Sequence, residues 1–498
     1  ISWIDLRVTT GRGMKLIQFK KIFAAAMSVA LAAGILSFAG CSSPKLSEVE
    51  NYTVEGDTLR VGIISDLQLE PEGGSDTYDN SYRKALEFLK AQDVDMMINA
   101  GDYTDTNTQE AADNVSRILN EVYPVEERPI SLSIMGNHDY WLPYFVDCWE
   151  IPFKGKMQRR TMDAVGESSP WTHKVVNCYH FIGFSPCNGD MDDGAYTDKI
   201  EWAREQIEIA LQDSDDRPIF VITHAPPSGT VNSNLDTEED SNVLNELFSQ
   251  YPQVVSISGH THAALMDDRS IWQGKYTAVN TQSLSYISTG LYAGEDEKSI
   301  EQNPMCMILE ISSNKLVFTR YSVLTGQQQG DVWQIDLPIA QHLDQYTDAR
   351  AEQSAAPVFP ENAQVTAEFK TYDPEHGPEL VLRFPSAQHE RYVYDYRVTA
   401  TGEDGNPKLL FPTGTDEDGN AQFTDQLDFV SDFYLGFDRM AQETVLRLSP
   451  EVTEYAKDFL NGTYTLNVTA IDTWGHESAP ISVRITVNGQ NITTAPGV

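Results

Sequence analysis

The sequence predicts an α/β domain followed by an all-β domain. Between about residues 59 and 325, short apolar runs bounded by glycine or polar residues alternate with stretches whose apolar residues recur at helical spacing. That alternation is typical of an α/β domain with a largely buried sheet. Beyond residue 360, segments rich in tyrosine, valine, threonine and isoleucine alternate with period two, which predicts a β-sandwich. A length of 498 residues fits two such domains.

Residues 1–40 have the composition of an export segment. A basic stretch from Met14 to Lys21 precedes an uncharged run over residues 22–38 and the small residues before Cys41, the order found in secretory signals. The sequence FAGC resembles the lipobox of bacterial lipoproteins, in which the cysteine becomes the lipidated first residue. An uncleaved membrane anchor is the alternative, because the run approaches the length of a spanning helix. Residues before Met14 are interpreted as an over-long start, and residues 41–58 as a tether.

The predicted elements of the α/β domain follow one another along the chain. The strands are expected in VGIIS (61–65), DMMINAG (95–101), ISLSIMGN (130–137), HFIGFS (180–185), PIFVITH (218–224) and VVSISGH (254–260). Helical spacing is found in residues 81–92, 111–123 and 198–212. These strands and helices would place the loops that follow the strands in one crevice.

Five of these strands end on residues of the type that bind metals. The endings are Asp66 with Gln68, Asp102 with Asp105, Asn137 with His138, the single His224, and His260 with His262. Ligands in open α/β sheets bind beyond the carboxyl ends of the strands, where such loops converge. One such ending alone carries little weight, but five in series are hard to explain by packing. The sequence therefore predicts a metal site.

The order D-x-Q, G-D-x-x-D, G-N-H-D, H and G-H-x-H resembles that of the calcineurin-like metallophosphoesterases over roughly residues 59–325. The resemblance implies a four-layer αββα sandwich for a domain of residues 59–345. It also implies two metal ions, divalent or trivalent, with a metal-bound hydroxide that attacks phosphorus. Asp66, Gln68, Asp102 and His262 would surround one ion. Asp102, Asn137, His224 and His260 would surround the other, with Asp102 bridging.

His138 has a different role in this resemblance. It faces the substrate and assists the leaving oxygen, Asp105 fixes its tautomer, and Asn137 holds a phosphoryl oxygen. Many family members carry histidine where this chain has Gln68. An amide oxygen is a harder donor than an imidazole nitrogen, which favours manganese or iron, with zinc or magnesium as alternatives. In the competing interpretation Gln68 only hydrogen-bonds a loop and a water takes its place at the metal.

The second domain is expected over residues 361–498, after a linker of residues 346–360. Period-two segments at 379–384, 391–402, 444–449, 462–472 and 481–487, with Asp-Gly turns at 404–405 and 418–419, predict an all-β sandwich. Its last two predicted strands resemble those of a fibronectin type III-like module. A spacer, a shield over the active site and a carbohydrate-binding module are the roles left open.

The charge of the chain limits its partners. There are 74 acidic against 35 basic residues, a formal net charge of −39. Nucleic acid polymers are therefore not expected as partners, because binding them needs clustered lysine and arginine. The sequence predicts an exported phosphoesterase, tethered to the bacterial membrane by lipid on Cys41, that acts on a nucleotide, a phospholipid headgroup or a cell-wall phosphate. The alternative is a non-catalytic cell-surface binding protein on the same scaffold.

Overall fold

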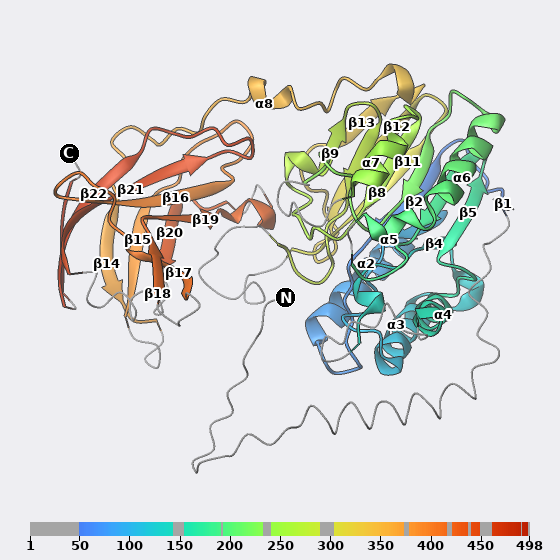
Figure 1. Cartoon of the computed structure of the whole chain (residues 1–498), viewed down its shortest axis with the longest axis horizontal. Helices are drawn as coiled ribbons and strands as arrows, with labels where there is room; N and C mark the ends of the chain where they lie inside the picture. Colours follow the sequence, from blue (N-terminus) through green and yellow to red (C-terminus); the bar gives the residue numbers. More distant parts are fainter. Residues whose placement is uncertain are drawn as a thin grey trace, which may run out of the picture. The chain divides into compact units, whose positions relative to one another are not determined.

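The computed structural model describes residues 49–142, 154–190, 193–232, 241–288, 303–372, 378–415, 421–436, 440–448, 461–489 and 491–496 (Figure 1). The predicted export segment and Cys41 lie outside these ranges. Among the helices in the described ranges, none has both the length and the apolar character needed to cross a membrane.

Two sheets form the centre of the first domain. The seven-stranded sheet has the order β1 (Glu50–Tyr52), β5 (Trp171–Val176), β6 (Tyr179–Phe184), β7 (Ile219–Ile222), β8 (Val254–Ser258), β10 (Thr277–Asn280) and β9 (Ile271–Gln273). The six-stranded sheet has the order β13 (Trp333–Asp336), β12 (Lys315–Ser322), β11 (Met305–Ile311), β2 (Leu59–Ile64), β3 (Met96–Asn99) and β4 (Ile130–Ser133). Strands β2, β3 and β4 are parallel, as are β6, β7, β8 and β10.

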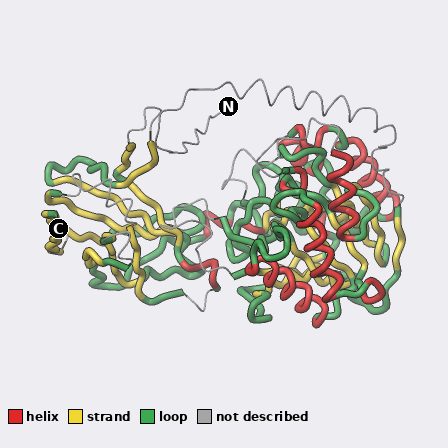
Figure 2. Tube along the Cα trace, turned by 90° about the horizontal axis from the view of Figure 1, so that it is seen from below, coloured by secondary structure: helices red, strands yellow, loops and turns green. Residues whose placement is uncertain are grey.

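Helices pack on the outer face of each sheet (Figures 1 and 2). The α-helices are α2 (Asp76–Ala91), α3 (Gln109–Val122), α4 (Lys154–Val165), α5 (Gly194–Thr197), α6 (Ile200–Asp213), α7 (Asn242–Phe248) and α8 (Arg350–Gln353). Short 3₁₀ turns are η2 (Val125–Glu127), η3 (His138–Tyr140), η4 (Asp268–Ser270), η6 (Ile339–Gln341) and η7 (Asp432–Leu435). Helix α2 begins before its periodic apolar residues because the side chain of Ser75 accepts a hydrogen bond from the backbone N–H of Tyr78 and caps it.

Three hydrophobic clusters define the layers of this domain. One fills the space between the two sheets, with residues such as Ile63, Ile98 and Phe220 fully buried. A second joins α2, α3 and α4 to the six-stranded sheet. A third joins α5, α6 and α7 to the seven-stranded sheet. The predicted four-layer αββα sandwich is confirmed.

The folded domain extends beyond the predicted limits at both ends. Residues 50–52, predicted to belong to a tether, form β1 and pair in parallel with β5. At the other end, Tyr346 is buried in the core between the sheets. Arg350, in the predicted linker, donates hydrogen bonds to the carbonyls of Asp268 and Ile271. Neither segment carries the strong periodicity of the other elements, so only long-range pairing reveals them.

The C-terminal region is built almost entirely of strands. One sheet contains β14 (Thr366–Lys370), β15 (Glu379–Pro385) and β20 (Glu443–Leu448). The other contains β19 (Gln426–Val430), β16 (Asp395–Gly402), β21 (Gly462–Ile471), β22 (Ile481–Asn488) and β23 (Asn491–Pro496). A separate pair is formed by β17 (Phe411–Thr415) and β18 (Ala421–Thr424). The two larger sheets share one buried core that includes Leu382, Val398 and Leu466. This arrangement is consistent with the predicted β-sandwich.

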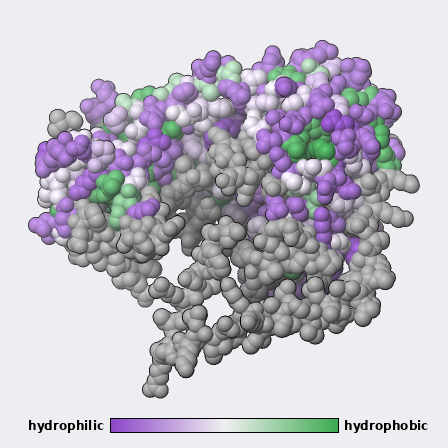
Figure 3. Space-filling model, in the orientation of Figure 1, coloured by the Kyte–Doolittle hydropathy of each residue, from purple (hydrophilic) through white to green (hydrophobic). Residues whose placement is uncertain are grey.

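Glycine turns connect these strands where the sequence predicted a turn. Gly405 has φ +78° in the Asp404–Gly405 turn, which only glycine adopts easily. Residues 418–419 lie outside the described ranges. Figure 3 shows a surface dominated by hydrophilic residues with small hydrophobic patches, as the composition leads one to expect.

Candidate metal centre

The loops after β2 and β3 run side by side and bring two carboxylates together. The backbone N–H of Asp66 donates to the carbonyl of Gly101 at 3.0 Å, and those of Leu67 and Gln68 both donate to the carbonyl of Asp102, at 2.8 and 3.0 Å. These bonds continue the parallel pairing of β2 and β3 beyond the strands. Asp66 and Asp102 are therefore fixed next to each other by the backbone, both almost completely buried.

Backbone strain is concentrated in these loops. Five predicted ligands have left-handed backbone conformations: Asp66 (φ 53°), Gln68 (φ 44°), Asp102 (φ 54°), His260 (φ 70°) and His262 (φ 51°). Such conformations in residues other than glycine cost roughly 1–3 kcal/mol each and persist where the surrounding structure enforces them, frequently at functional sites. The left-handed conformations at these five residues therefore support a functional site, in which the required side-chain directions outweigh the energetic cost to the backbone.

Asp66, Asp102 and His262 form the first group of possible ligands. Each offers one ligand atom, and these atoms all lie within 4.8 Å of one another. His262 Nε2 is 3.3 Å from Asp66 Oδ1, and its Nδ1 is 3.1 Å from the carbonyl of Tyr286. A carbonyl only accepts, so Nδ1 carries a proton. A neutral His262 consequently directs the lone pair of Nε2 at the carboxylate, as a metal ligand does.

His224, Asn137 and Asp102 form the second group. His224 Nδ1 is 2.7 Å from the carbonyl of Ala100, while Nε2 lies 3.0 Å from Asn137 Oδ1 and 3.2 Å from Asp102 Oδ2. Two oxygens that cannot donate thus face one imidazole nitrogen. His260 contributes its backbone N–H to Asp66 Oδ1 at 3.1 Å, and its ring lies edge-on to that of His224, with centroids 5.0 Å apart.

The pKa values of His224 and Asp102 show that the second group favours a positive charge. Burial lowers the pKa of His224, but the charges of Asp102 and Asp66 outweigh it and raise this pKa to about 9. Burial raises the pKa of Asp102, yet His224 and His138 hold it below its ordinary value. Asp102 Oδ2 is buried and accepts no hydrogen bond from the described residues. A divalent cation can supply the positive charge that these buried carboxylates attract, so the donor set fits a metal.

Two glycines provide the space that these groups need. A Cβ added to Gly136 would lie 2.1 Å from Asp102 Oδ1 and 2.6 Å from His224 Nε2. At Gly259 it would lie 2.1 Å from Ser65 Oγ and 2.5 Å from Asp66 Oδ2. No real Cβ approaches that closely, so any larger residue would displace these side chains.

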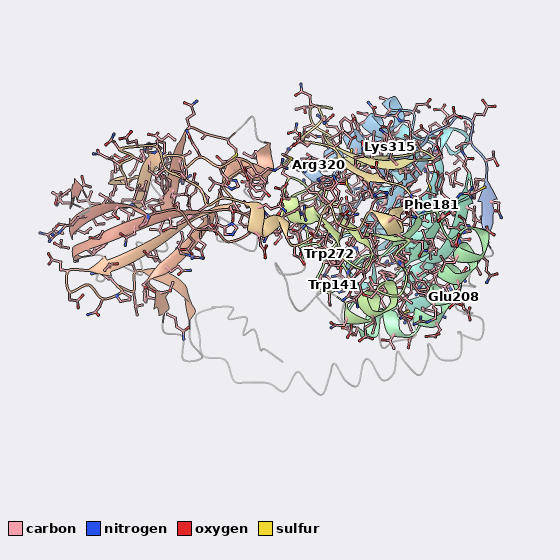
Figure 4. All side chains as sticks on the ribbon, turned by 90° about the horizontal axis from the view of Figure 1, so that it is seen from above. Trp141, Phe181, Glu208, Trp272, Lys315 and Arg320 are labelled. Atoms are coloured by element: carbon pink, nitrogen blue, oxygen red, sulfur yellow. The ribbon has the colours of Figure 1, made fainter. Side chains whose placement is uncertain are left out.

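His138 lies next to the two groups, on the turn η3. Its backbone N–H donates to Asp102 Oδ1 at 2.9 Å. Its Nδ1 is 2.8 Å from the backbone carbonyl of Asp105 and 3.8 Å from the carboxylate of the same residue. The contact of Asp105 with the His138 ring is thus made by its main-chain carbonyl rather than by its side chain. Trp141, labelled in Figure 4, packs on the His138 ring with centroids 4.0 Å apart.

Gln68 is held on both sides of its amide. Its Nε2 lies 3.2 Å from His138 Nε2, and its Oε1 accepts a hydrogen bond from Ser285 Oγ at 2.8 Å. Ser283 Oγ in turn contacts Ser285 Oγ at 2.8 Å and donates to the carbonyl of Asp66. Sequence reasoning missed both serines, because TQSLSY (281–286) matches no motif and lies more than 200 positions from Gln68.

Asp139 stabilises the turn that carries His138. Its carboxylate accepts hydrogen bonds from the backbone N–H groups of Gly136, Tyr103 and Thr104 and from the Thr104 hydroxyl. Burial raises the pKa of Asp139 to about 7, and the charge of Asp102 adds to this. Of the two aromatic residues that follow, Tyr140 is fully buried and packs the loop, whereas Trp141 packs on the ring of His138.

Comparison with known proteins identifies the family that the first domain resembles. Residues 59–264 match the family model of the calcineurin-like phosphoesterases. No curated protein matches the chain. Among solved structures, a purple acid phosphatase from yellow lupin (Lupinus luteus) seeds is 13% identical, with TM-score 0.40 and coverage of 59% of this chain and 55% of that one. The match thus spans little more than half of the lupin enzyme.

Two shorter proteins are covered over almost their whole length. A predicted phosphoesterase from Streptococcus pneumoniae is 11% identical, with TM-score 0.27 and coverage of 57% of this chain and 99% of that one. Vacuolar protein sorting 29 from Cryptosporidium parvum is 12% identical, with TM-score 0.30 and coverage of 56% and 100%.

Proposed function

We propose that the calcineurin-like phosphoesterase domain of this chain hydrolyses phosphate esters with two metal ions held at the carboxyl ends of its strands. The observation that carries the proposal is the pair of histidines, His224 and His262. Each donates from Nδ1 to a backbone carbonyl and directs Nε2 at a buried carboxylate. This orientation is that of metal-binding imidazoles, whose other nitrogen is fixed by an outer hydrogen bond.

The residues would divide between two ions. Asp66 and His262 would hold one, Asn137, His224 and His260 the other, and Asp102 would contact both. When bound, the ions supply positive charge for the phosphoryl oxygens and acidify water. The oxygen-rich donor set favours manganese or iron, with zinc or magnesium as alternatives. The local positive charge would also offset the repulsion between the acidic protein and a phosphorylated substrate.

Around these ions, the side chains would position the ester. The amide of Asn137 would orient a phosphoryl oxygen, and His138 would assist the leaving oxygen by exchanging a proton with it. Asp105 would maintain the ring orientation of His138 through its backbone carbonyl. We further propose that the substrate is small: a nucleotide, a phospholipid headgroup or a cell-wall phosphate.

The test uses full-length protein stripped of metal by a chelator. Hydrolysis of an aryl phosphate monoester and an aryl phosphodiester is measured after adding Mn²⁺, Fe²⁺, Zn²⁺ or Mg²⁺. Turnover restored by metal in the wild type and lost in Asp102→Asn supports the proposal. Asp93→Asn is the matched control, because Asp93 also has a left-handed backbone (φ 51°) but is exposed at the end of α2. Bound metal without turnover of any ester would instead support the non-catalytic binding protein.

The export of the protein is a separate proposal that rests on residues 1–41. If Cys41 is lipidated after cleavage, the wild type should partition with membranes in the bacterium and Cys41→Ala should be released or remain unprocessed. Mass spectrometry of the N-terminal peptide measures the outcome directly. An unmodified Cys41 in membrane-bound protein would contradict lipid anchoring.

A further inference from the structure

We propose that the C-terminal β-sandwich positions the loop that carries His260 and His262, with Arg391 as a positioning residue. This role rests on the proposed function, because both histidines are proposed metal ligands of the phosphoesterase domain. It is a further role for the sandwich, beside the spacer, the shield and the carbohydrate-binding module. A spacer needs only a covalent connection, whereas the described residues of the two domains belong to one compact unit and meet through specific contacts.

The loop leaves the candidate metal centre as a tight turn. The backbone N–H of Asp267 donates to the carbonyl of Ala264 at 2.9 Å, and Ser270 Oγ donates to the same carbonyl at 3.1 Å. Leu265 and Met266, inside the turn, are fully buried in the core between the sheets. Because few residues separate this turn from the two histidines, whatever fixes residues 267–269 also limits where the imidazoles can lie.

The sandwich holds the turn through charged and polar groups. Arg391 donates to both carboxylate oxygens of Asp268, from Nε at 3.0 Å and from Nη2 at 2.7 Å. The backbone N–H of Asp268 donates to Tyr392 Oη at 2.8 Å. Thr473 Oγ1 donates to Asp267 Oδ1 at 2.8 Å. Since a guanidinium that binds both oxygens of a carboxylate fixes direction as well as distance, these contacts orient the turn.

Aromatic rings of the sandwich continue the core of the first domain. The guanidinium of Arg269, paired with Asp267 at 2.6 Å, lies 4.7 Å from the centroid of the Tyr394 ring. The rings of Tyr392 and Phe433 are stacked, with centroids 4.8 Å apart. All three rings belong to the buried cluster that fills the space between the two sheets. Domains joined by polar contacts alone are free to move, but a shared apolar core opposes such motion.

Arg391 also reaches the turn by a second route. Its Nη1 donates to Asp331 Oδ2 at 3.0 Å, and the carbonyl of Asp331 accepts from Arg320 Nη2 at 2.7 Å. Arg320, labelled in Figure 4, donates from Nη1 to the carbonyl of Leu265 at 2.9 Å. Its guanidinium lies 4.4 Å from the centroid of the Trp333 ring, which fixes its position. Arg391 is therefore connected to both ends of the turn.

A third contact joins the sandwich to the opposite side of the turn. The carbonyl of Leu435 accepts from Asn303 Nδ2 at 3.2 Å. The carbonyl of Asn303 accepts from Gln282 Nε2 at 2.7 Å, and Gln282 Oε1 accepts from the backbone N–H of Leu265 at 2.9 Å. Asn303 and Gln282 are both buried. The turn is thus held from two sides by the sandwich.

The test compares two arginines of the sandwich in the full chain. Arg391→Ala removes the contact with the turn. Arg397→Ala is the matched control, because Arg397 in β16 pairs with Asp428 at 2.7 Å within the sandwich. The two arginine side chains have similar exposed fractions, 35% and 28%. Both variants lose a comparable ion pair, so only the contact with the turn distinguishes them.

Metal binding is measured by calorimetry with Mn²⁺ alone. Arg391→Ala should raise the Kd roughly 3- to 10-fold, less than the 10- to 100-fold effect of losing a direct partner of a ligand. Arg397→Ala should leave the Kd unchanged. An unchanged Kd in Arg391→Ala, or an equal rise in both variants, would overturn the proposal.

Turnover provides a readout that a general structural defect would not move. Hydrolysis of an aryl phosphate by Arg391→Ala should fall at limiting Mn²⁺ by the same factor as the metal affinity. It should return toward the wild-type rate at saturating Mn²⁺, because a misplaced loop weakens metal binding first. A loss that saturating Mn²⁺ does not reduce would contradict the positioning role.

A double-mutant cycle tests the contact through which Arg391 acts. Residues in direct contact have non-additive effects. Combining Arg391→Ala with Asp268→Ala should therefore raise the Kd for Mn²⁺ by less than the product of the two single effects. A combined effect equal to that product would show that Arg391 does not act through Asp268.

Hydrogen exchange of the metal-free protein separates the positioning role from the proposed function. Peptides that cover residues 260–270 should exchange faster in Arg391→Ala than in the wild type or in Arg397→Ala. If exchange and Kd are unchanged while esters are hydrolysed, the positioning role fails and the proposed function stands. If the loop loses protection but the wild type hydrolyses no ester, the support from the sandwich stands and the proposed function fails.

Discussion

Two pairs of buried histidines differ in what their ring nitrogens contact. In the candidate metal centre, His224 and His262 each donate from Nδ1 to a backbone carbonyl and face a carboxylate through Nε2. On the neighbouring strands β5 and β6, His173 and His180 are equally buried. Each of their ring nitrogens contacts another side chain, in a series that we call the closed chain. Burial therefore does not separate a candidate ligand from a structural histidine.

The closed chain occupies all four ring nitrogens. His173 Nδ1 is 2.9 Å from Gln206 Oε1, and His173 Nε2 is 2.8 Å from His180 Nδ1. His180 Nε2 is 3.1 Å from Asp213 Oδ2. These contacts fit a structural role for both residues. Hydrogen-bond partners, rather than residue type or burial, therefore distinguish the two pairs. This difference can be tested by changing residues in either pair's surroundings.

The largest expected effect is the stabilisation of the protein by metal. Ligand binding to the native state alone, at a concentration 100 times the Kd, stabilises by about 2.7 kcal/mol. Adding Mn²⁺ to metal-free protein should therefore raise the Tm of the wild type and of His173→Gln alike, but not that of Asp102→Asn. Differential scanning calorimetry measures all three. If His173→Gln also lost the response, the two pairs would not be independent.

A smaller effect is expected from filling the space beside the ligands. Gly136→Ala should destabilise the protein by roughly 1–3 kcal/mol, as overpacking of a tight interior does, and weaken Mn²⁺ binding. The added Cβ cannot avoid Asp102 Oδ1 and His224 Nε2. Gly155→Ala in α4 is the matched control, since its nearest atom, Arg159 Nη1, is 3.7 Å from the added Cβ. Urea unfolding with and without Mn²⁺ gives both quantities, and equal behaviour of the two variants would contradict the prediction.

The smallest expected effect is on the acid stability contributed by the closed chain. Burial lowers the pKa of His173 to about 4, and the neighbouring His180 adds to this, against the hydrogen bond with Gln206. The unfolded chain, with the ordinary value near 6.5, then binds the proton more readily than the folded protein. The contribution of His173 to the free energy of unfolding is fully present above about pH 6.5 and is lost as the pH falls toward 4. The loss between pH 7 and 5 should be roughly 2 kcal/mol.

His173→Gln tests this sign. The variant should be less stable than the wild type at pH 7, because the closed chain is broken, but its stability should fall less steeply between pH 7 and 5. Denaturant unfolding at both pH values provides the difference. Parallel pH dependence of the two proteins would show that His173 does not titrate in this range.

Much of the fold could be predicted from the sequence because periodicity and burial are local properties. The six predicted strands of the first domain agree with β2, β3, β4, β6, β7 and β8, and the predicted helices with α2, α3 and α6. The residues at the strand ends followed from the same pattern, since a strand that stops at Asp66 or His224 must present that residue to the crevice. Strand β1 was missed because its three residues are stabilised by pairing with β5.

The sequence by itself determined which residue types meet at the carboxyl ends of the strands, and hence that a cation can bind there. Only the tertiary structure decided what each side chain contacts. Asp105 acts on His138 through its carbonyl, and Gln68 is bound by Ser285, 217 positions away. The physical reason is that a hydrogen bond depends on distance and direction within a few tenths of an ångström. Those quantities are set where distant loops pack together, and no local pattern in the chain records them.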